Sequence, residues 1–265
     1  MKTKKVGQVL SIVLPLLVIA AFAAGCAKSA RDGAISHTDF AGKNIGVIIG
    51  MICNVIAEDD IGGRALYYSD RANAVEDVKN GVIAGFMIDL SIARVMVGQP
   101  GNENLQVVEI PAEIFSGPLG AISADQDIID NFNAFLAGAK ADGTLAEMQK
   151  RWLADNPDPA MPDIPLTNEN GILKVATGGT SQPFSYTGAD GRLKGYSIEL
   201  AMRFAAHERM ELEFAVMGFA ELIPVAAEGD VDFGIDAITI TEERDQLILF
   251  TDSIHDDRMG IITRK

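Results

Sequence analysis

Short apolar runs alternate with amphipathic stretches along most of the chain. The apolar runs at 45–49, 83–88 and 173–176 have the length and β-branched content of buried strands. In the stretches 70–79 and 128–139, apolar residues recur every three or four positions, which predicts helices with one buried face. Strands that alternate with helices indicate an α/β fold built on largely parallel, helix-covered sheets.

This alternation is interrupted once in the middle of the chain. Residues 156–165 hold four of the ten prolines, Pro157, Pro159, Pro162 and Pro165. Proline lacks a backbone N–H and fixes φ, so this segment is predicted to be a stiff, extended connector without a helix or a central strand. The pattern thus predicts two α/β blocks, one before and one after the connector.

The first 25 residues read as an export signal. Three lysines among the first five residues precede an apolar run over 6–24, which is the charged start and hydrophobic core of a signal peptide. The small residues that precede Cys26 resemble the lipobox of bacterial lipoproteins, in which the cysteine is acylated. Cys26 is therefore the expected lipidation site, with an ordinary signal peptide or an uncleaved anchor as the alternatives.

Composition narrows the function class. A hydrophobic content of 48% excludes a disordered chain. Removing the three leader lysines from 22 basic residues leaves 19 against 37 acidic residues, a net charge near −18 that disfavours binding to nucleic-acid backbones. Two cysteines and three histidines cannot supply a disulfide framework or a typical zinc site, so neither a metal nor a cofactor is expected.

A set of separated motifs resembles the bacterial solute-binding proteins that serve polar amino acid ABC transporters. In the second block they are Leu173–Thr177, Pro183–Tyr186, Gly195–Leu200, Leu222–Pro224, Gly229–Asp232, Ile238–Arg244 and Phe250–Asp252; in the first they are Gly42–Val47, Asn80–Gly81 with Asp89, Phe132–Asn133, Asp142–Thr144 and Lys150–Trp152. Together they cover nearly all of residues 38–264. The resemblance implies a two-lobed periplasmic-binding-protein-like fold of type II.

The order of the two blocks is exchanged relative to that family. There the material of residues 171–264 comes first and that of residues 40–153 follows, so the chain resembles a circular permutation whose new ends meet at a surface loop. The expected parts are a signal peptide (1–25), a tether (26–39), a lobe 2-like part (40–112), a return strand with the C-terminal helices (113–155), the linker (156–170), a lobe 1-like part (171–255) and a crossing strand (256–265). A slice of a longer tandem protein and a swapped dimer are the alternatives.

Arg244 is the candidate for binding the carboxylate of an amino acid. Its planar guanidinium can form two parallel charge-assisted hydrogen bonds, and it stands in a short helix that Thr241 can cap. The resemblance implies that Thr239 and Arg244 hold the ligand carboxylate. A surface arginine paired with Glu243 or Asp245 is the alternative.

Asp89 is the candidate for binding the ammonium group. It closes the apolar strand 83–88, and the resemblance implies that this aspartate pairs with the ammonium. An aspartate that caps the helix following residue 89 is the alternative. Ala84 and Gly85 depart from the Asp-Ala pair usual in the family.

Two further segments match ligand-contacting positions of the family. Gly50 resembles a glycine turn that offers backbone N–H groups, with Met51 in place of a threonine, and Phe219 matches a frequent aromatic wall or else is an ordinary core residue.

Three positions depart from the family pattern. Ser181 replaces a frequent aromatic, Gly178 a frequent acid, and Asp236-Ala237 a small-Gly pair. Asp236 can contact an ammonium group or a basic side chain, or be a strand-end charge that faces water.

The resulting expectation is an extracytoplasmic, lipid-anchored protein that closes on an amino acid or similar small zwitterion and delivers it to an ABC transporter permease. No enzyme activity and no nucleic-acid partner are expected. The alternatives are a dehydratase-like enzyme on the same scaffold, for which Glu221 is the only candidate acid noted, a sensory module, and an inactive fragment of a tandem binding protein.

Overall fold

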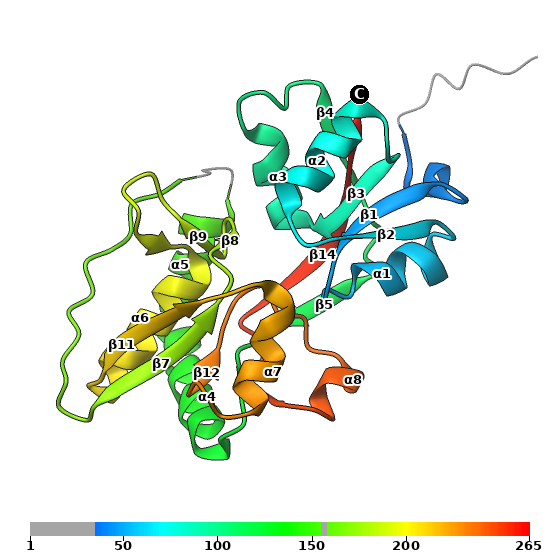
Figure 1. Cartoon of the computed structure of the whole chain (residues 1–265). Helices are drawn as coiled ribbons and strands as arrows, with labels where there is room; N and C mark the ends of the chain where they lie inside the picture. Colours follow the sequence, from blue (N-terminus) through cyan, green and yellow to red (C-terminus); the bar gives the residue numbers. More distant parts are fainter. Residues whose placement is uncertain (1–34, 155–157) are drawn as a thin grey trace, which may run out of the picture. The chain divides into compact units, whose positions relative to one another are not determined.

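The computed structural model describes residues 35–154 and 158–265. These residues form two main β-sheets, each with its own helices, and a small three-stranded sheet beside the second (Figure 1). The α/β class and the two lobes expected from the sequence are confirmed. The exchanged order of the blocks stays a prediction.

The first sheet combines the N-terminal half of the chain with its last strand. Its strands are β1 (Asn44–Ile48), β2 (Arg64–Tyr68), β3 (Gly85–Asp89), β4 (Leu105–Glu109) and β14 (His255–Arg264). Their order is β2-β1-β3-β14-β4, with β1 parallel to β2 and β3, and β14 antiparallel to β3 and β4. The C-terminal strand is therefore an internal strand of a sheet that otherwise comes from residues 44–109.

Helices and helical turns accompany this sheet. They are η1 (His37–Phe40), α1 (Cys53–Val55), the π-helical turn η2 (Ile56–Asp60), α2 (Arg71–Asn80) and α3 (Leu90–Gly98). Helix α2 begins where the sequence predicts, because the Asp70 side chain accepts a hydrogen bond from Asn73 N. It buries Ala74, Val75 and Val78, the face that the apolar spacing predicts.

The second sheet has the strand order β11-β7-β12-β6-β13. Its strands are β6 (Ile122–Ser123), β7 (Ile172–Thr177), β11 (Glu211–Val216), β12 (Phe233–Gly234) and β13 (Leu249–Phe250), and the small sheet holds β8 (Thr180–Ser181), β9 (Ser185–Thr187) and β10 (Leu193–Lys194). The helices are α4 (Gln126–Ala141), α5 (Thr144–Leu153), α6 (Tyr196–Glu208), η3 (Phe219–Glu221), α7 (Leu222–Ala227) and α8 (Glu242–Asp245). Strands β7, β11 and β12 are parallel, whereas β6 is antiparallel to β12 and β13.

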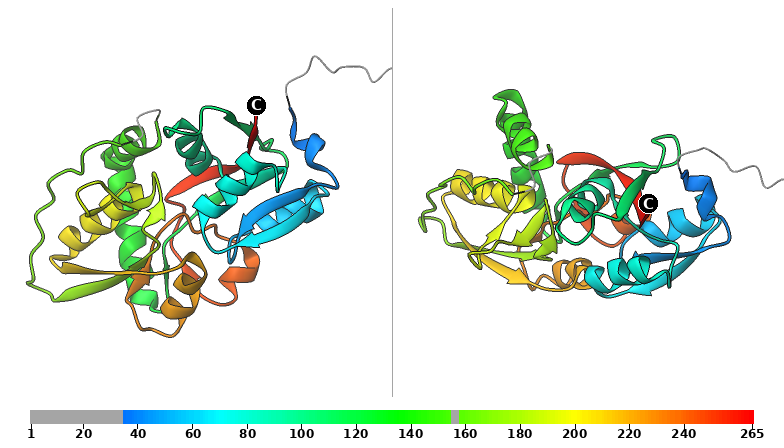
Figure 2. Two further views of the ribbon diagram at one scale, coloured as in Figure 1. Left: turned by 45° about the horizontal axis from the view of Figure 1, so that its top comes forward. Right: turned by 90° about the horizontal axis from the view of Figure 1, so that it is seen from above.

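Two stretches of chain connect the sheets, and they run beside each other. Strand β5 (Ser116–Leu119) pairs with the first residues of β14, His255–Arg258. Beyond β5 the chain enters the second sheet at β6, and before β14 it leaves that sheet at β13 (Figures 1 and 2). The connection between the lobes is therefore a pair of antiparallel segments.

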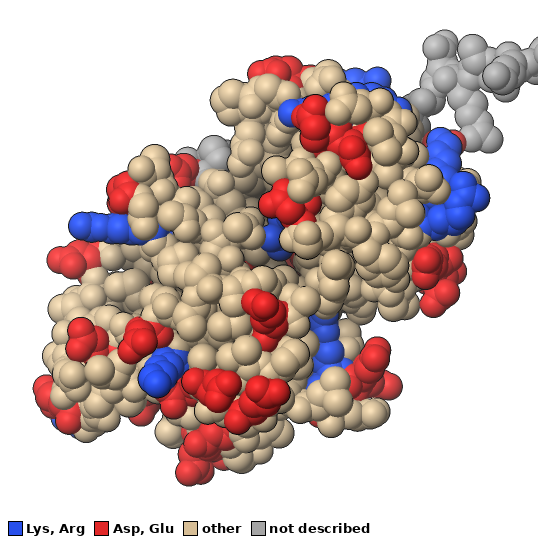
Figure 3. Space-filling model, in the orientation of Figure 1, with Lys and Arg blue, Asp and Glu red and all other residues tan. Residues whose placement is uncertain are grey.

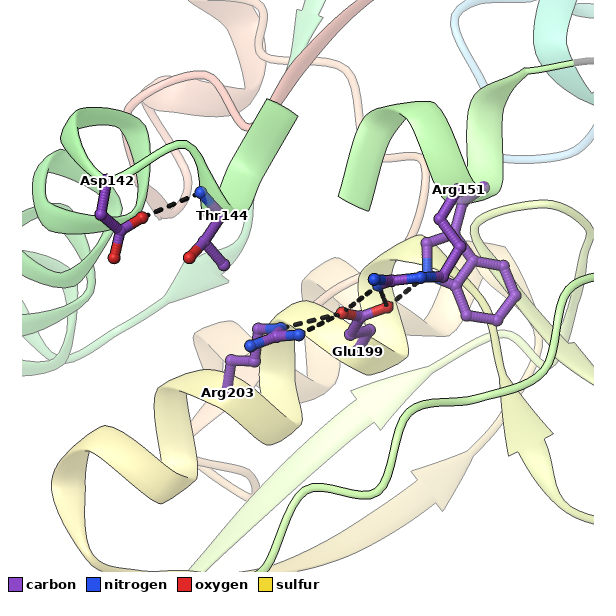
Figure 4. A network of polar contacts seen from close by, with 6 residues as sticks. Asp142, Thr144, Arg151, Glu199 and Arg203 are labelled. Atoms are coloured by element: carbon purple, nitrogen blue, oxygen red, sulfur yellow. Dashed lines mark hydrogen bonds and ion pairs between the residues drawn. The ribbon is translucent and has the colours of Figure 1, made fainter. Parts of the chain in front are cut away.

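A buried ion-pair network joins α5 to α6 across the connector. The Glu199 carboxylate has no exposed surface and accepts hydrogen bonds from Arg151 Nη1 at 2.6 Å, Trp152 Nε1 at 2.6 Å and Arg203 Nε at 2.8 Å (Figure 4). Arg151 and Trp152 precede the proline-rich segment and Glu199 follows it. This network ties the two sides of the connector into one lobe.

The two ends of the described fold approach each other around one residue of β3. A Cβ atom at Gly85 would lie 2.8 Å from Phe40 Cε1 and 2.3 Å from Ile261 Cγ2. Phe40, near the start of the fold, and Ile261, near its end, thus pack on the same spot. Their bulk also explains why glycine replaces the family's alanine at position 85.

Several local predictions differ from the structure. Glu147 stands three residues after Thr144, a spacing that predicts a capping box. Instead, Gly143 precedes the helix in a left-handed conformation, and Thr144 N donates to Asp142 Oδ1 at 2.9 Å (Figure 4). The apolar residues 119–122 predict one strand, which is interrupted at Gly120 and Ala121, where the chain passes between sheets. The apolar pattern over 219–227 predicts one helix, which begins as a 3-10 turn.

The expectations for the leader, for Cys26 and for Pro157 lie outside the described residues. From residue 158 to residue 171 the structure has no helix or strand, in agreement with the proline pattern. Within the described ranges, no helix has both the length and the apolar character needed to cross a bilayer. Acidic side chains are spread over the face seen in Figure 3, as the net charge predicts.

Candidate functional site

Residues from both lobes line a cavity of about 1210 Å³. From the first lobe it is lined by Ile48, Ile49 and Arg71, and from the second by Gly178, Thr180 and Phe219, among others. Phe219 is half-buried, packs against both apolar cores and faces this cavity, which fits the aromatic wall and the core role that the sequence left open.

Arg244 lies at the contact between the lobes. Thr241 caps α8 as predicted and accepts a hydrogen bond from Arg244 N. The guanidinium donates from Nη1 to the carbonyl oxygen of Thr239 at 2.7 Å and from Nη2 to that of Gly50 at 2.7 Å. Burial lowers the pKa of Arg244, opposed by the charge of Asp89.

The Gly50 turn presents a carbonyl oxygen to the other lobe. The N–H of Met51, which the resemblance assigns to the ligand, donates instead to Ile48 O at 3.1 Å, and the Met51 side chain is buried in the core. Gly50 has φ +84°, and a Cβ there would lie 2.9 Å from Ala220 Cα of the second lobe. The lobes therefore approach too closely at this turn for a side chain.

Asp89 is the last residue of β3. It is 1% exposed, and within the described part of the chain its Oδ2 atom has no hydrogen-bond partner. Its pKa is raised to about 8, chiefly by burial and next by the charge of Asp257, against the lowering effect of the Arg71 charge. A carboxylate in this position is poorly compensated and would gain from a cationic partner.

Asp89 does not cap the helix that follows it. The residue occupies the N-cap position of α3, but its side chain makes no cap hydrogen bond. Ser91 N donates instead to Asp257 Oδ2 at 3.3 Å, so a residue of the crossing strand β14 serves the helix start. The Asp89 side chain is left for the site.

Asp236 is fully buried beside Gly178. Its Oδ2 accepts a hydrogen bond from Gly178 N at 2.9 Å, and its Oδ1 accepts one from Ala237 N at 2.7 Å. Burial raises the pKa of Asp236, and the charge of Arg71 lowers it, as does a hydrogen bond from Ser181. Asp236 is thus not a strand-end charge that faces water.

The residues at positions 178 and 236 depend on each other, because their side chains compete for the same space. A Cβ at Gly178 would lie 2.5 Å from Asp236 Oδ2, so the carboxylate fills the space that a side chain at 178 would take. Both residues follow the carboxyl ends of neighbouring parallel strands, β7 and β12. The acid that the family often has at 178 and the acid at 236 therefore exclude each other.

Arg71 is the residue that the sequence analysis missed. It is the first residue of α2, in the first lobe, and donates to Thr180 Oγ1 at 2.7 Å and to Ser181 Oγ at 3.0 Å in the second. A lone arginine at a helix start resembles any solvated cation, so composition gives no signal. The usable signal is position, since α2 follows a parallel strand and its N-terminus faces the edge where ligands bind in such sheets.

The structure brings the predicted residues together around the interlobe contact. The charges of Arg71 and Asp236 affect the pKa of Asp89, and the charge of Asp89 affects the pKa of Arg244. Glu221 is exposed and accepts a hydrogen bond from Gly218 N. No group of three or more histidine, cysteine, aspartate or glutamate side chains in the described ranges has the geometry of a metal site.

Comparison with known proteins identifies the second block. The model for bacterial extracellular solute-binding proteins, family 3, matches residues 173–265. The L-cystine-binding protein TcyJ of Escherichia coli (strain K12) is 33% identical over 76 residues, covering 29% of this chain and 29% of that protein.

Two further relatives match over similar lengths. A probable histidine-binding protein of Neisseria gonorrhoeae is 27% identical over 88 residues, 33% of either chain. Cyclohexadienyl dehydratase of Pseudomonas aeruginosa is 30% identical over 83 residues, 31% of either chain. The chain therefore spans about a third of the length of the relatives it matches. Residues 173–265 therefore resemble family 3 of the bacterial extracellular solute-binding proteins.

Proposed function

We propose that this protein binds a small amino acid, or a similar zwitterion, between its two lobes and delivers it to an ABC transporter permease. The observation that carries the proposal is Asp89, a buried carboxylate with an unpartnered oxygen in a site that also holds two arginines. The ligand's ammonium pairs with Asp89, and its carboxylate is held by Arg244 and Thr239. Relatives named for binding histidine and cystine support this ligand class.

The two-lobed arrangement supports a closure mechanism. Only the closed form brings Arg244 of one lobe and Asp89 of the other to the same ligand, so the ligand stabilises that form. The permease then recognises the closed lobes. Attachment of Cys26 to a lipid would keep the protein on the extracytoplasmic face of the membrane.

Isothermal titration with each of the twenty amino acids tests the proposal. We expect one or a few to bind with micromolar or tighter affinity, and Arg244→Ala to weaken that binding. Arg94→Ala, which changes an exposed arginine paired with Glu109 on the surface, is the matched control and should leave affinity unchanged. If no amino acid binds the folded protein, the proposal is wrong.

A dehydratase-like enzyme is the second candidate function. A relative named as cyclohexadienyl dehydratase matches part of the chain, and Asp89, whose pKa is near 8, is a carboxyl group able to act as an acid near neutral pH. Incubation with the bound amino acid or with a cyclohexadienyl compound, followed by NMR of the solution, distinguishes the two functions: unchanged ligand favours binding, and a new product favours the enzyme.

A further inference from the structure

Arg71 links the two lobes directly. It extends from the start of α2 and donates two hydrogen bonds to hydroxyl groups of β8, from Nη1 to Thr180 and from Nη2 to Ser181. Both acceptors are uncharged, and no hydrogen bond from Arg71 to a carboxylate is among the contacts of the described residues. Arg71 is partly buried, so its charge is only partly compensated by these neutral acceptors.

The hydroxyl groups that accept from Arg71 connect it to a buried carboxylate. Ser181 Oγ accepts a hydrogen bond from Arg71 and also bonds to Asp236, whose carboxylate fills the space beside Gly178. A cation of the first lobe is thus linked through Ser181 to a buried acid of the second lobe. The guanidinium also lines the interlobe cavity.

One donor of Arg71 is unused. Its Nε atom is buried and has no hydrogen-bond partner within residues 35–154 and 158–265. A buried charged N–H without an acceptor is unfavourable, and an oxygen atom of a ligand would relieve it. A cationic ligand side chain would do the opposite, because it would approach a like charge inside a site of low polarity.

We propose that Arg71 determines the ligand's side chain: its Nε–H and its charge select amino acids whose side chain ends in a carboxylate or carboxamide oxygen, and they exclude cationic amino acids. This inference rests on the proposed amino-acid binding function. The proposed preference differs from that of relatives named for binding histidine. In this chain, Arg71 already places a positive charge in the part of the cavity that the side chain of a basic ligand would enter.

Titration of the full-length protein with L-glutamate, L-glutamine, L-aspartate, L-asparagine and L-arginine tests the inference. We expect at least one of the four oxygen-bearing ligands to bind at least ~10-fold more tightly than L-arginine. Arg71→Ala should weaken binding of that ligand about tenfold or more and narrow or reverse its advantage over L-arginine.

Two companion variants separate charge from geometry. Arg71→Lys keeps the charge but loses Nε, so it should still reject L-arginine while binding the preferred ligand more weakly. Arg94→Ala removes an exposed cation of the same lobe that does not line this cavity, and it should leave the ratio of affinities unchanged. A melting curve of each variant checks that it is folded.

The outcomes distinguish this inference from the function on which it rests. If L-arginine binds the parent protein best, or Arg71→Ala leaves the ratio unchanged, the role of Arg71 is wrong although amino-acid binding stands. If none of the twenty amino acids binds the parent protein, the proposed function fails and this inference fails with it.

Discussion

Arg244 Nη2 donates a hydrogen bond to the carbonyl oxygen of Gly50 at 2.7 Å, although the two residues are 194 positions apart and belong to different lobes. The same guanidinium is fixed from the other side by the carbonyl oxygen of Thr239. Arg244 therefore links the lobes through two backbone carbonyl oxygens, and in the proposed function its charge also holds the ligand's carboxylate.

Arg244→Lys should separate these roles. Lysine keeps the charge but cannot donate to two acceptors in the geometry of a planar fork, so we expect the affinity for the amino acid to fall by about 1.5–3 kcal/mol, roughly 10- to 100-fold. Titration calorimetry at pH 8 measures the effect. An affinity within twofold of the parent value would mean that Arg244 does not contact the ligand.

Ligand affinity should depend on pH through Asp89. Its pKa is raised to about 8 by burial and by the Asp257 charge, so below pH 8 it is largely protonated before the ligand arrives. Pairing with an ammonium group lowers that pKa, and a proton is released. Affinity should therefore rise between pH 6 and pH 8, at most tenfold per unit, and level off above.

Calorimetry in two buffers of different ionisation enthalpy counts the released protons. Asp89→Asn should bind more weakly and show no pH dependence in this window, because the amide does not titrate. Equal proton release by the parent and the Asn variant would assign the effect to another group, such as Asp236.

The same shift should make the ligand-free protein less stable as pH rises. The folded-state pKa of Asp89 lies above the usual value of 3.8, so between pH 4 and pH 8 the folded state holds a proton that the unfolded state has lost. The free energy of unfolding should fall over that range by at most about 1.4 kcal/mol per pH unit for this group. Asp236, whose pKa is also raised, adds a slope of the same sign.

Urea unfolding at pH 5, 6, 7 and 8 measures this slope. Asp89→Asn should flatten it and should be more stable than the parent protein at pH 8, where the parent must bury a charge. A stability that increases steadily from pH 5 to pH 8 would contradict the assignment.

Glu199 should be the most costly single charge to remove from the second lobe. Its carboxylate is completely buried and binds Arg151, Arg203 and Trp152, whereas the two arginines keep 30% of their side-chain surface exposed. Glu199→Ala leaves two partly buried cations and an indole N–H without their acceptor, and we expect a loss of about 3 kcal/mol in the free energy of unfolding.

Glu109→Gln provides the surface comparison for that measurement. Glu109 pairs with Arg94 and Arg258, but its side chain is 42% exposed, so its loss should cost less than about 1 kcal/mol in urea unfolding at pH 7. Equal losses for the two variants would show that the Glu199 network contributes no more than an exposed pair.

The sequence was enough to predict a helix end where the residue type before the helix has one dominant physical role. Thr241 caps its helix as predicted, because a short polar side chain before a helix satisfies a free backbone N–H. Thr144 and Glu147 do not form a capping box, because the helix begins at Thr144 itself and Gly143, in a left-handed conformation, occupies the N-cap position.

The site depended more on contacts between distant segments. Position along the sequence could not show that Asp257 would replace Asp89 at the start of α3, or that Asp236 would fill the space at Gly178, since each depends on strand pairing. Arg71 was missed for the same reason: its partners lie more than one hundred positions away. Family resemblance supplied Arg244 and Asp89, whose roles as ligand contacts stay predictions.

Restoring the block order of the family should preserve the fold. A chain in which residues 171–265 are followed by residues 40–154, joined at Lys265 by a short glycine-serine linker, retains the Glu199 network and both crossing segments. Phe40 and Ile261 already meet at Gly85, so the new joint closes a small gap at a surface loop. We expect a monomer with the far-UV circular dichroism of the parent protein and a melting temperature within about 5 °C, a shift that corresponds to roughly 1–2 kcal/mol.

Residues 35–265 in their present order are the matched control on the same size-exclusion column. Aggregation of the reordered chain beside a monomeric control would favour a slice of a tandem protein, whereas a dimeric control that becomes monomeric on reordering would favour exchange of lobes between chains.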